Sequence, residues 1–309
     1  MVGAFFTLIL CLMRVLFSYS LAALLLFGSC SQAQSEKSPH EPKGSSGKKH
    51  KKESLENRFT EAAVPGLKRL GQLEGVQESS GLALGQPGTY YTMGDQGNPP
   101  ILYQVDGDGK LLKEVRLSAT NEDWESITHS PDGTLFVADA GNNNNSRRDL
   151  TIYRVNPAQP DAVGQIHFTY PDQQEFPPKK KQRNFDCEAS VWHDGQIYLF
   201  TRDRGSKAIS KVYTVPDKSG TYTARRVASL SIPDEVTDAS ISPNGRQLVL
   251  MGSEQMFVLK GASLSSLLKA KPRRIALPGA GQTEGVLFTD DQTLLISSEQ
   301  GSLYQYKMP

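Results

Sequence analysis

Short apolar segments alternate with polar turns along most of this chain, and they recur in the same order. Residues 121–139, NEDWESITHSPDGTLFVAD, predict a short strand, an Asp-Gly hairpin turn and a second strand with alternating apolar positions. Aligning the repeats of this pattern places five residues at equivalent positions: Ser80, Glu125, Glu188, Asp238 and Glu284. By subtraction of residue numbers, their spacings are 45, 63, 50 and 46 residues. Repeats of this length are typical of the blades of a β-propeller.

Each repeat supplies the strands of one blade, which predicts an all-β fold. The expected strands, in chain order, are 81–84, 90–94, 101–105, 111–117, 126–128, 134–138, 150–155, 164–170, 189–192, 196–201, 211–215, 222–230, 239–242, 247–251, 256–259, 273–277, 285–288, 293–297 and 302–306. A short helix is expected at 263–269. A longer loop at 171–184 accounts for the spacing of 63 residues.

The fifth repeat is one strand short of the four that a blade needs. Residues 67–75 precede the first repeat and carry strand-like apolar positions. We expect them to supply the missing outer strand, which would close the ring and remove an exposed sheet edge. The sequence therefore predicts a five-bladed β-propeller closed by an N-terminal strand. A six-bladed ring with a degenerate blade in the loop of the second repeat is the alternative.

The first 57 residues differ in composition from the repeats. Residues 1–29 are apolar except for Arg14, and they end in small residues before Cys30. This segment resembles a bacterial lipoprotein signal peptide, in which Cys30 would become the lipid anchor to the membrane. Met13 is an alternative start that would give a leader of ordinary length. A plain transmembrane anchor is the alternative to a signal peptide.

Residues 30–57 are rich in Ser, Lys, Gly and Pro, and so polar a segment buries too little apolar surface to fold. We expect a disordered tether there, with the propeller domain at 58–309. This arrangement predicts a lipoprotein anchored in the bacterial cell envelope and facing the periplasm or the exterior.

The net charge bears on the expected partners, and the cysteine content bears on the possible disulfides. The formal net charge of +1 offers no general attraction for nucleic acid, and we expect a monomer that binds none. If the leader is removed and Cys30 is lipidated, Cys187 is the only remaining thiol. No intrachain disulfide then forms, and stability must come from the core.

The equivalent positions carry the candidate metal site. Because the first strand of each propeller blade lines the central channel, Ser80, Glu125, Glu188, Asp238 and Glu284 are expected to converge on the axis. Four carboxylates so close together repel one another unless their pKa values rise or a cation neutralises them. Oxygen ligands without a thiolate or a suitably spaced histidine favour calcium. The alternative is that these acids bind backbone amides at strand starts.

A second polar group follows the second strand of each repeat and is expected around the channel mouth. It includes Asp95, Asp139 and Asp203, less regularly Glu254 and Glu299, and the interleaved Arg202 and Arg204, with amides from Asn142 to Asn145. The alternative is that the aspartates only form turns. The basic cluster at 179–183, KKKQR, is either a solvated loop or a rim for anionic partners.

The motifs Glu78-Ser-Ser-Gly81, Asp123-Trp-Glu125, Glu188-Ala189 and Glu284-Gly285 resemble those of calcium-activated nucleotidases, the secreted apyrases. That resemblance implies a five-bladed propeller with calcium in the channel and hydrolysis of nucleoside di- and triphosphates. The Asp-Trp-Glu, Gly-Asn-Asn and Asp-Cys-Glu-Ala motifs are also similar to those of uncharacterised bacterial secreted propellers, from which no activity carries over.

Three functions are consistent with these residues. In the first, a calcium-dependent hydrolase acts on a phosphorylated small molecule, with Asp139 or Asp203 orienting water and Arg202 or Arg204 neutralising phosphate charge. In the second, a non-catalytic binding module has a structural channel ion. A lactonase-like sugar-acid hydrolase is the third. A propeller fold does not choose among them.

Overall fold

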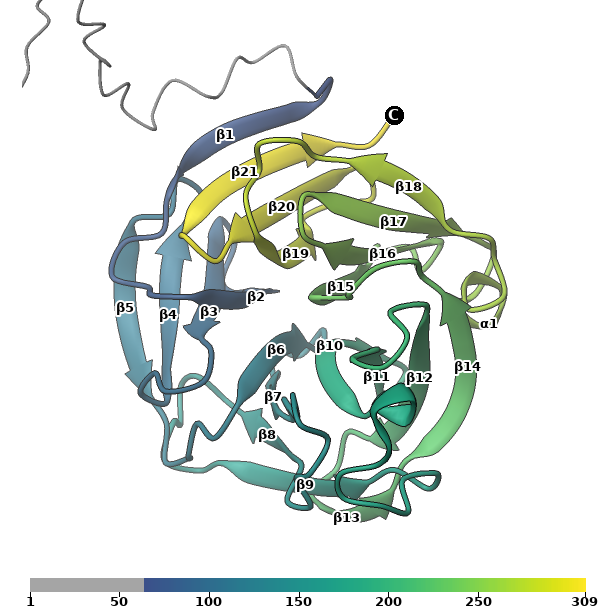
Figure 1. The fold of residues 1–309 in the computed structure, drawn as a ribbon. Helices are drawn as coiled ribbons and strands as arrows, with labels where there is room; N and C mark the ends of the chain where they lie inside the picture. Colours follow the sequence, from purple (N-terminus) through teal and green to yellow (C-terminus); the bar gives the residue numbers. More distant parts are fainter. Residues whose placement is uncertain (1–63) are drawn as a thin grey trace, which may run out of the picture. The chain divides into compact units, whose positions relative to one another are not determined.

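Each sequence repeat forms one antiparallel sheet in the computed structural model, which describes residues 64–309 (Figure 1). Within this range there are five sheets around a common axis, with the first strand of each blade nearest the axis. This arrangement confirms the five-bladed propeller. The leader, Cys30 and the tether lie outside the described residues. Between residues 64 and 309, no helix is long and apolar enough to span a bilayer.

The blades follow one another in chain order. Blade 1 contains β2 (Ser79–Leu84), β3 (Thr89–Gly94), β4 (Ile101–Asp106) and β5 (Leu111–Arg116). Blade 2 contains β6 (Trp124–His129), β7 (Leu135–Asp139), β8 (Thr151–Val155) and β9 (Gly164–Thr169). Blade 3 contains β10 (Asp186–His193), β11 (Gln196–Arg202), β12 (Ile209–Pro216) and β14 (Arg225–Ser231). Blade 4 contains β15 (Asp238–Ile241), β16 (Gln247–Gly252), β17 (Gln255–Lys260) and β18 (Arg273–Ala276).

Blade 5 joins the two ends of the propeller. It contains β19 (Thr283–Phe288), β20 (Thr293–Ser298), β21 (Ser302–Lys307) and, as its outer strand, β1 (Leu67–Gln72). Strand β1 pairs antiparallel with β21, and Leu67 lies opposite Tyr306 (Figure 1). The predicted closure by an N-terminal strand is therefore confirmed. The loop proposed to hide a sixth blade carries only a 3-10 turn, η2 (Lys180–Gln182).

Blade 2 has a fifth strand that the sequence pattern did not reveal. The segment expected as one strand at 222–230 is divided into β13 (Gly220–Thr223) and β14. Strand β13 pairs parallel with β9 of the neighbouring blade, and the N–H of Ala224 donates to the carbonyl of Thr169 at 2.9 Å. Hydrophobic alternation shows which residues are extended but not which neighbour they pair with. The expected short helix forms as α1 (Leu264–Leu267), capped by Ser263 and Ser266.

The hydrophobic core lies between neighbouring blades. Between blades 1 and 2, the fully buried Trp124 packs in one cluster with Met93 and Ile127, and its indole N–H donates to the carbonyl of Thr120 at 2.8 Å. Similar clusters of buried apolar side chains lie between the other pairs of neighbouring blades. Cys187 is fully buried in one of them, and burial raises its pKa, as expected for a small apolar residue.

Small residues follow the axial positions because the inner strands approach one another closely. Gly81 has a φ of 91°, and a Cβ there would lie 3.0 Å from the backbone nitrogen of Ile127 in the next blade. A Cβ on Gly285 would contact the Oγ of Ser297 and would lie 3.1 Å from a side-chain carbon of Leu82. Larger side chains at these positions would push the inner strands away from the axis.

The closing strand makes one contact that a single methyl group should disrupt. A Cβ on Gly71 would lie 2.0 Å from the backbone oxygen of Asp108, in the turn between β4 and β5. Because backbone atoms of two blades must separate to admit it, we expect Gly71→Ala to cost about 1–3 kcal/mol of unfolding free energy. Thermal denaturation followed by circular dichroism measures the loss. Gly107→Ala, where a Cβ meets nothing within 4 Å, is the matched control. Equal melting temperatures for the two variants would contradict this account of closure.

Candidate functional site

A polar pocket of about 210 Å³ opens where the inner strands begin; we call it the channel pocket. Its lining consists of Glu78, Ser79, Ser80, Asp95, Glu125, Asn143, Glu188, Arg202, Arg204, Gln282, Glu284 and Glu299. Six of these residues are carboxylates and two are arginines. A neighbouring hollow of about 250 Å³ shares Arg202, Gln282 and Glu284 with it. The structure therefore brings four of the five predicted axial residues into one cavity.

Irregular strand pairing directs these four side chains into the channel. The ladder between the first two strands skips Ser80 and Gly81 in blade 1, Glu125 in blade 2, Glu188 in blade 3 and Glu284 in blade 5. Such a β-bulge leaves a residue unpaired and re-aims its side chain. The repeated acid is therefore a bulged residue and not a regular member of the strand.

Blade 4 lacks this irregularity, and Asp238 does not line the channel pocket. Asp238 pairs regularly with Met251 of β16. Its fully buried carboxyl accepts the N–H of Val286 at 2.7 Å and faces the hydroxyl of Ser126 at 3.5 Å. Asp238 thus holds the start of β15 to the neighbouring blade, which is the structural role considered for these acids as an alternative to metal binding.

Two arginines neutralise Glu188. The guanidinium of Arg204 donates to Oε1 of Glu188 at 2.7 Å, and that of Arg202 donates to Oε2 at 3.0 Å. Arg204 also pairs with Asp186 at 2.5 Å, and Arg202 pairs with Glu235 at 2.5 Å. Both oxygens of Glu188 are therefore occupied by charged donors from the same blade.

Asp186 and Glu235 complete this network, although sequence alignment of the repeats did not single them out. Asp186 is fully buried, and it also accepts the N–H of Asn142 at 2.5 Å. Lys207 contacts Glu235 at 2.8 Å. The one available signal for Asp186 was its place two residues before Glu188 on the same strand, because its partners come from other segments of the chain.

Glu125 lies among acids without a compensating cation. Part of its side chain faces the channel pocket, but burial and the charges of Glu188, Asp186 and Asp123 raise its pKa well above the usual range. Burial, together with Asp186, raises the pKa of Asp123 to about 6. The buried Oδ1 of Asp123 has no hydrogen-bond partner among the described residues. A Cβ on Gly141 would lie 2.5 Å from the other oxygen of Asp123, so the surrounding loop packs closely.

A second acidic group forms the rim on the blade 1 and blade 5 side. Burial, with the neighbouring charge of Glu78, raises the pKa of Asp95 to about 7. The amide of Asn98 donates to Asp95 at 3.1 Å and to Glu78 at 3.2 Å. At the start of blade 5, the amide of Gln282 donates to Glu284 at 3.0 Å.

The predicted water-orienting acids lie away from the channel pocket. Asp139 forms an ion pair with Arg147 at 2.9 Å and accepts the N–H of Asp123 at 3.0 Å. Asp203 accepts the backbone N–H groups of Gly205 and Ser206, both at 3.0 Å, and holds the turn after β11. Both aspartates organise backbone, whereas their expected companions Asp95, Glu299, Arg202 and Arg204 do line the pocket.

The donor chemistry of the channel pocket suits a hard cation, but the side chains do not form a closed metal cage. Within residues 64–309, no group of three or more His, Cys, Asp or Glu side chains is arranged so that it could hold a metal ion. Among the predicted carboxylate ligands that line the channel pocket, Glu125 and Glu284 have no Lys or Arg ion-pair partner within residues 64–309. Asp123, which has one unpartnered oxygen, is a neighbour of Glu125. Carboxylate oxygens of this kind are the ligands that calcium prefers.

The raised pKa of Asp95 predicts how stability depends on pH. With a folded-state pKa of about 7 against a model value of 3.8, the folded state binds more protons than the unfolded state between these pH values. The contribution of Asp95 to stability therefore falls as pH rises from about 4 to 7. We expect Asp95→Asn to remove this fall. The melting temperature of the variant should therefore rise relative to that of the wild type as the pH increases across this range. Asp108→Asn, in an exposed turn, is the control. A difference that is constant with pH would contradict the assignment.

Comparison with known proteins supports the fold. No protein-family model and no curated protein matches the sequence. Similar solved structures include glutaminyl cyclase from Myxococcus xanthus, with 9% identity over 78% of this chain and 95% of that chain and a TM-score of 0.50. A gluconolactonase from Xanthomonas campestris shares 12% identity over 79% of this chain and 89% of that chain, with a TM-score of 0.47. Virginiamycin B lyase from Staphylococcus aureus shares 14% identity over 75% of this chain, with a TM-score of 0.40, and the match spans 66% of the lyase. The likeness to the glutaminyl cyclase is one of fold alone.

Proposed function

We propose that this protein is a calcium-binding propeller of the bacterial cell envelope, with the ion at the channel pocket. The observation that carries the proposal is the charge balance of the pocket lining, which has six carboxylates and two arginines. Both arginines pair with Glu188, so the remaining carboxylates have no ion-pair partner among residues 64–309. Burial and, after it, repulsion between neighbouring acids raise the pKa values of Glu125 and Asp95, and a cation would relieve that repulsion.

Glu125 and Glu284 are the residues that would hold the ion. They come from blades 2 and 5, and the bulges at both positions direct their side chains into the pocket. The hydroxyl of Ser80 donates to the backbone carbonyl of Glu125 at 3.2 Å, which fixes the backbone that carries this ligand. Glu188 would bind an ion only after giving up a guanidinium. The envelope location is supported by the leader and Cys30.

Removal of one ligand should separate ion binding from folding. Because burial and the neighbouring acids raise the pKa of Glu125, an uncharged amide suits this position, and Glu125→Gln should retain the fold but lose the effect of calcium. For the wild type, calcium at a hundredfold excess over its dissociation constant should add about 2.7 kcal/mol of stability. Differential scanning fluorimetry at pH 8, with and without calcium, measures the effect.

Glu114→Gln on the exposed face of β5 is the matched control and should respond to calcium like the wild type. The proposal fails if calcium does not raise the melting temperature of the wild type, or raises that of Glu125→Gln by the same amount.

Hydrolysis of phosphate esters or anhydrides is the second candidate, and one observation favours it. Arg202 and Arg204 line the same pocket as the acids, so a phosphate group at the mouth would meet guanidinium donors beside the ion site. A bound divalent ion supplies Lewis-acid polarisation of a phosphoryl oxygen. Glu188 positions the two guanidiniums by accepting a hydrogen bond from each. Asp186 and Glu235 hold their other ends in place.

A substrate panel tests this second candidate. We expect release of inorganic phosphate from nucleoside di- and triphosphates or p-nitrophenyl phosphate, dependent on calcium and abolished by Glu188→Gln, because the arginines lose their common anchor. Glu114→Gln should retain the wild-type rate. Calcium-dependent stabilisation without turnover of any of these compounds would contradict the hydrolase. It would indicate a non-catalytic binding module with a structural channel ion.

A further inference from the structure

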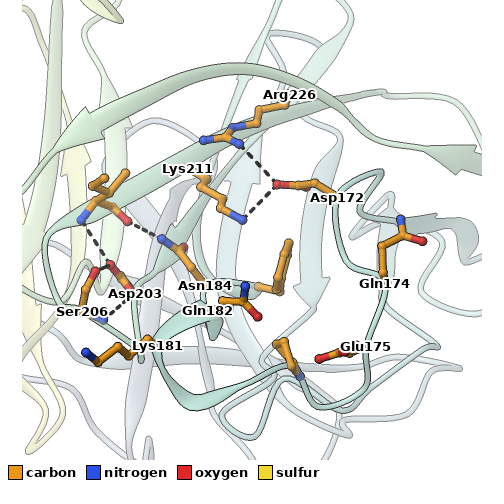
Figure 2. Close-up of a pocket in the computed structure, with 13 residues that line it drawn as sticks. Asp172, Gln174, Glu175, Lys181, Gln182, Asn184, Asp203, Ser206, Lys211 and Arg226 are labelled. Atoms are coloured by element: carbon orange, nitrogen blue, oxygen red, sulfur yellow. Dashed lines mark hydrogen bonds and ion pairs between the residues drawn. The ribbon is translucent and has the colours of Figure 1, made fainter.

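A second cavity of the described region lies away from the channel pocket. It has a volume of about 530 Å³ and shares no lining residue with that pocket; we call it the insertion pocket (Figure 2). One wall is the loop at 171–184, which accounts for the wide spacing between the second and third repeats. The other wall is the turn from Asp203 to Ile209, and the floor includes Lys211 of β12 and Arg226 of β14. The cavity thus exists because of the inserted loop.

Two cations converge on one carboxylate oxygen at one end of the insertion pocket. The ammonium of Lys211 contacts Oδ2 of Asp172 at 3.0 Å, and the guanidinium of Arg226 contacts the same oxygen at 3.3 Å (Figure 2). The other oxygen of Asp172 accepts the hydroxyl of Tyr213 at 2.7 Å. Two positive charges therefore face one negative charge, and this end of the cavity carries an excess of positive charge.

This excess is local, because three acids and three bases line the cavity as a whole. The carboxylate of Asp203 is surrounded by the N–H and O–H donors of its own turn. Glu175 lies at the opposite end of the cavity from Arg226 (Figure 2). Lys181, from the basic cluster at 179–183, lines the cavity and forms no ion pair within residues 64–309. Of the three cations, Lys181 and Arg226 are exposed, and Lys211 is the one that lies mostly buried.

The ammonium group of Lys211 is already partly desolvated, which favours the binding of an anion. Its side chain is 14% exposed, and its ammonium lies 3.8 Å from the ring centre of Phe185. Burial lowers the pKa of Lys211, although its ion pair with Asp172 opposes the shift. Because this ammonium has already lost much of its water, an incoming anion displaces little more. The remaining lining combines polar side chains, among them the exposed amide of Gln182, with the apolar Phe185 and Ile209.

We propose that the insertion pocket binds a hydrophilic organic anion of monosaccharide size, such as a sugar acid or a sugar phosphate. Its volume falls in the range of small-molecule sites. Amide and carboxylate side chains at the rim match hydroxyl groups, and Lys211, Arg226 and Lys181 match a carboxylate or a phosphate. This binding is independent of calcium in the channel pocket.

Isothermal titration calorimetry of the purified full-length protein tests the proposal with three probes: D-glucuronate, D-glucose 6-phosphate and neutral D-glucose. We expect at least one of the two anions to bind about tenfold or more tightly than glucose. The preferred anion identifies whether the pocket is built for a carboxylate or for a phosphate. Binding should weaken as sodium chloride is added, because screening reduces the attraction.

Two variants test whether the anion binds in the insertion pocket. Lys211→Gln should weaken binding about tenfold or more, because it removes a poorly solvated charged donor. Lys181→Gln changes an exposed side chain, keeps the fold and should weaken binding about threefold. Lys113→Gln on the exposed face of β5 should bind like the wild type. The proposal is overturned if neither anion binds more tightly than glucose, or if Lys181→Gln and Lys211→Gln both bind the anion with wild-type affinity.

Discussion

The convergence of five inner strands on one axis is the constraint on which this molecule depends. Closure by β1 on β21 fixes the ring, and the inner strands then approach so closely that Gly81 and Gly285 have no room for a larger side chain. Bulges next to these positions turn the preceding residues toward the axis in four blades. The acidic pocket is therefore a direct result of how the ring closes.

Acidic side chains that are crowded at the axis repel one another, and the blades deal with this repulsion in two ways. In blade 3, Arg202 and Arg204 surround Glu188, and removing one partner from such a buried network typically costs about 3–5 kcal/mol. In blades 1 and 2, Asp95 and Glu125 have no Lys or Arg partner among residues 64–309, and burial with the neighbouring acids raises their pKa values, as burial and Asp186 also do for Glu188. The calcium proposal rests on this asymmetry between neighbouring blades.

The turn between β11 and β12 connects two cavities with different chemistry. Arg204 points toward the acids of the channel pocket, whereas its neighbour Asp203 lines the insertion pocket. A Cβ on Gly205 would lie 2.8 Å from the carbonyl oxygen of Lys181, so this turn packs directly against the inserted loop. The same short segment thus positions an arginine of the acidic pocket and one wall of the pocket that we propose for an anion.

The sequence by itself determined the five repeats, the closing strand and the axial places of Ser80, Glu125, Glu188 and Glu284, because alternation and turn residues are local signals. Only the tertiary structure decided that Asp238 faces a neighbouring blade, since the direction of that side chain depends on whether its strand is bulged or regular. It also decided the partners of the arginines, the pairing of β13 with β9 and the insertion pocket. These features join residues far apart in the chain, and no local pattern of apolar and polar positions specifies such contacts.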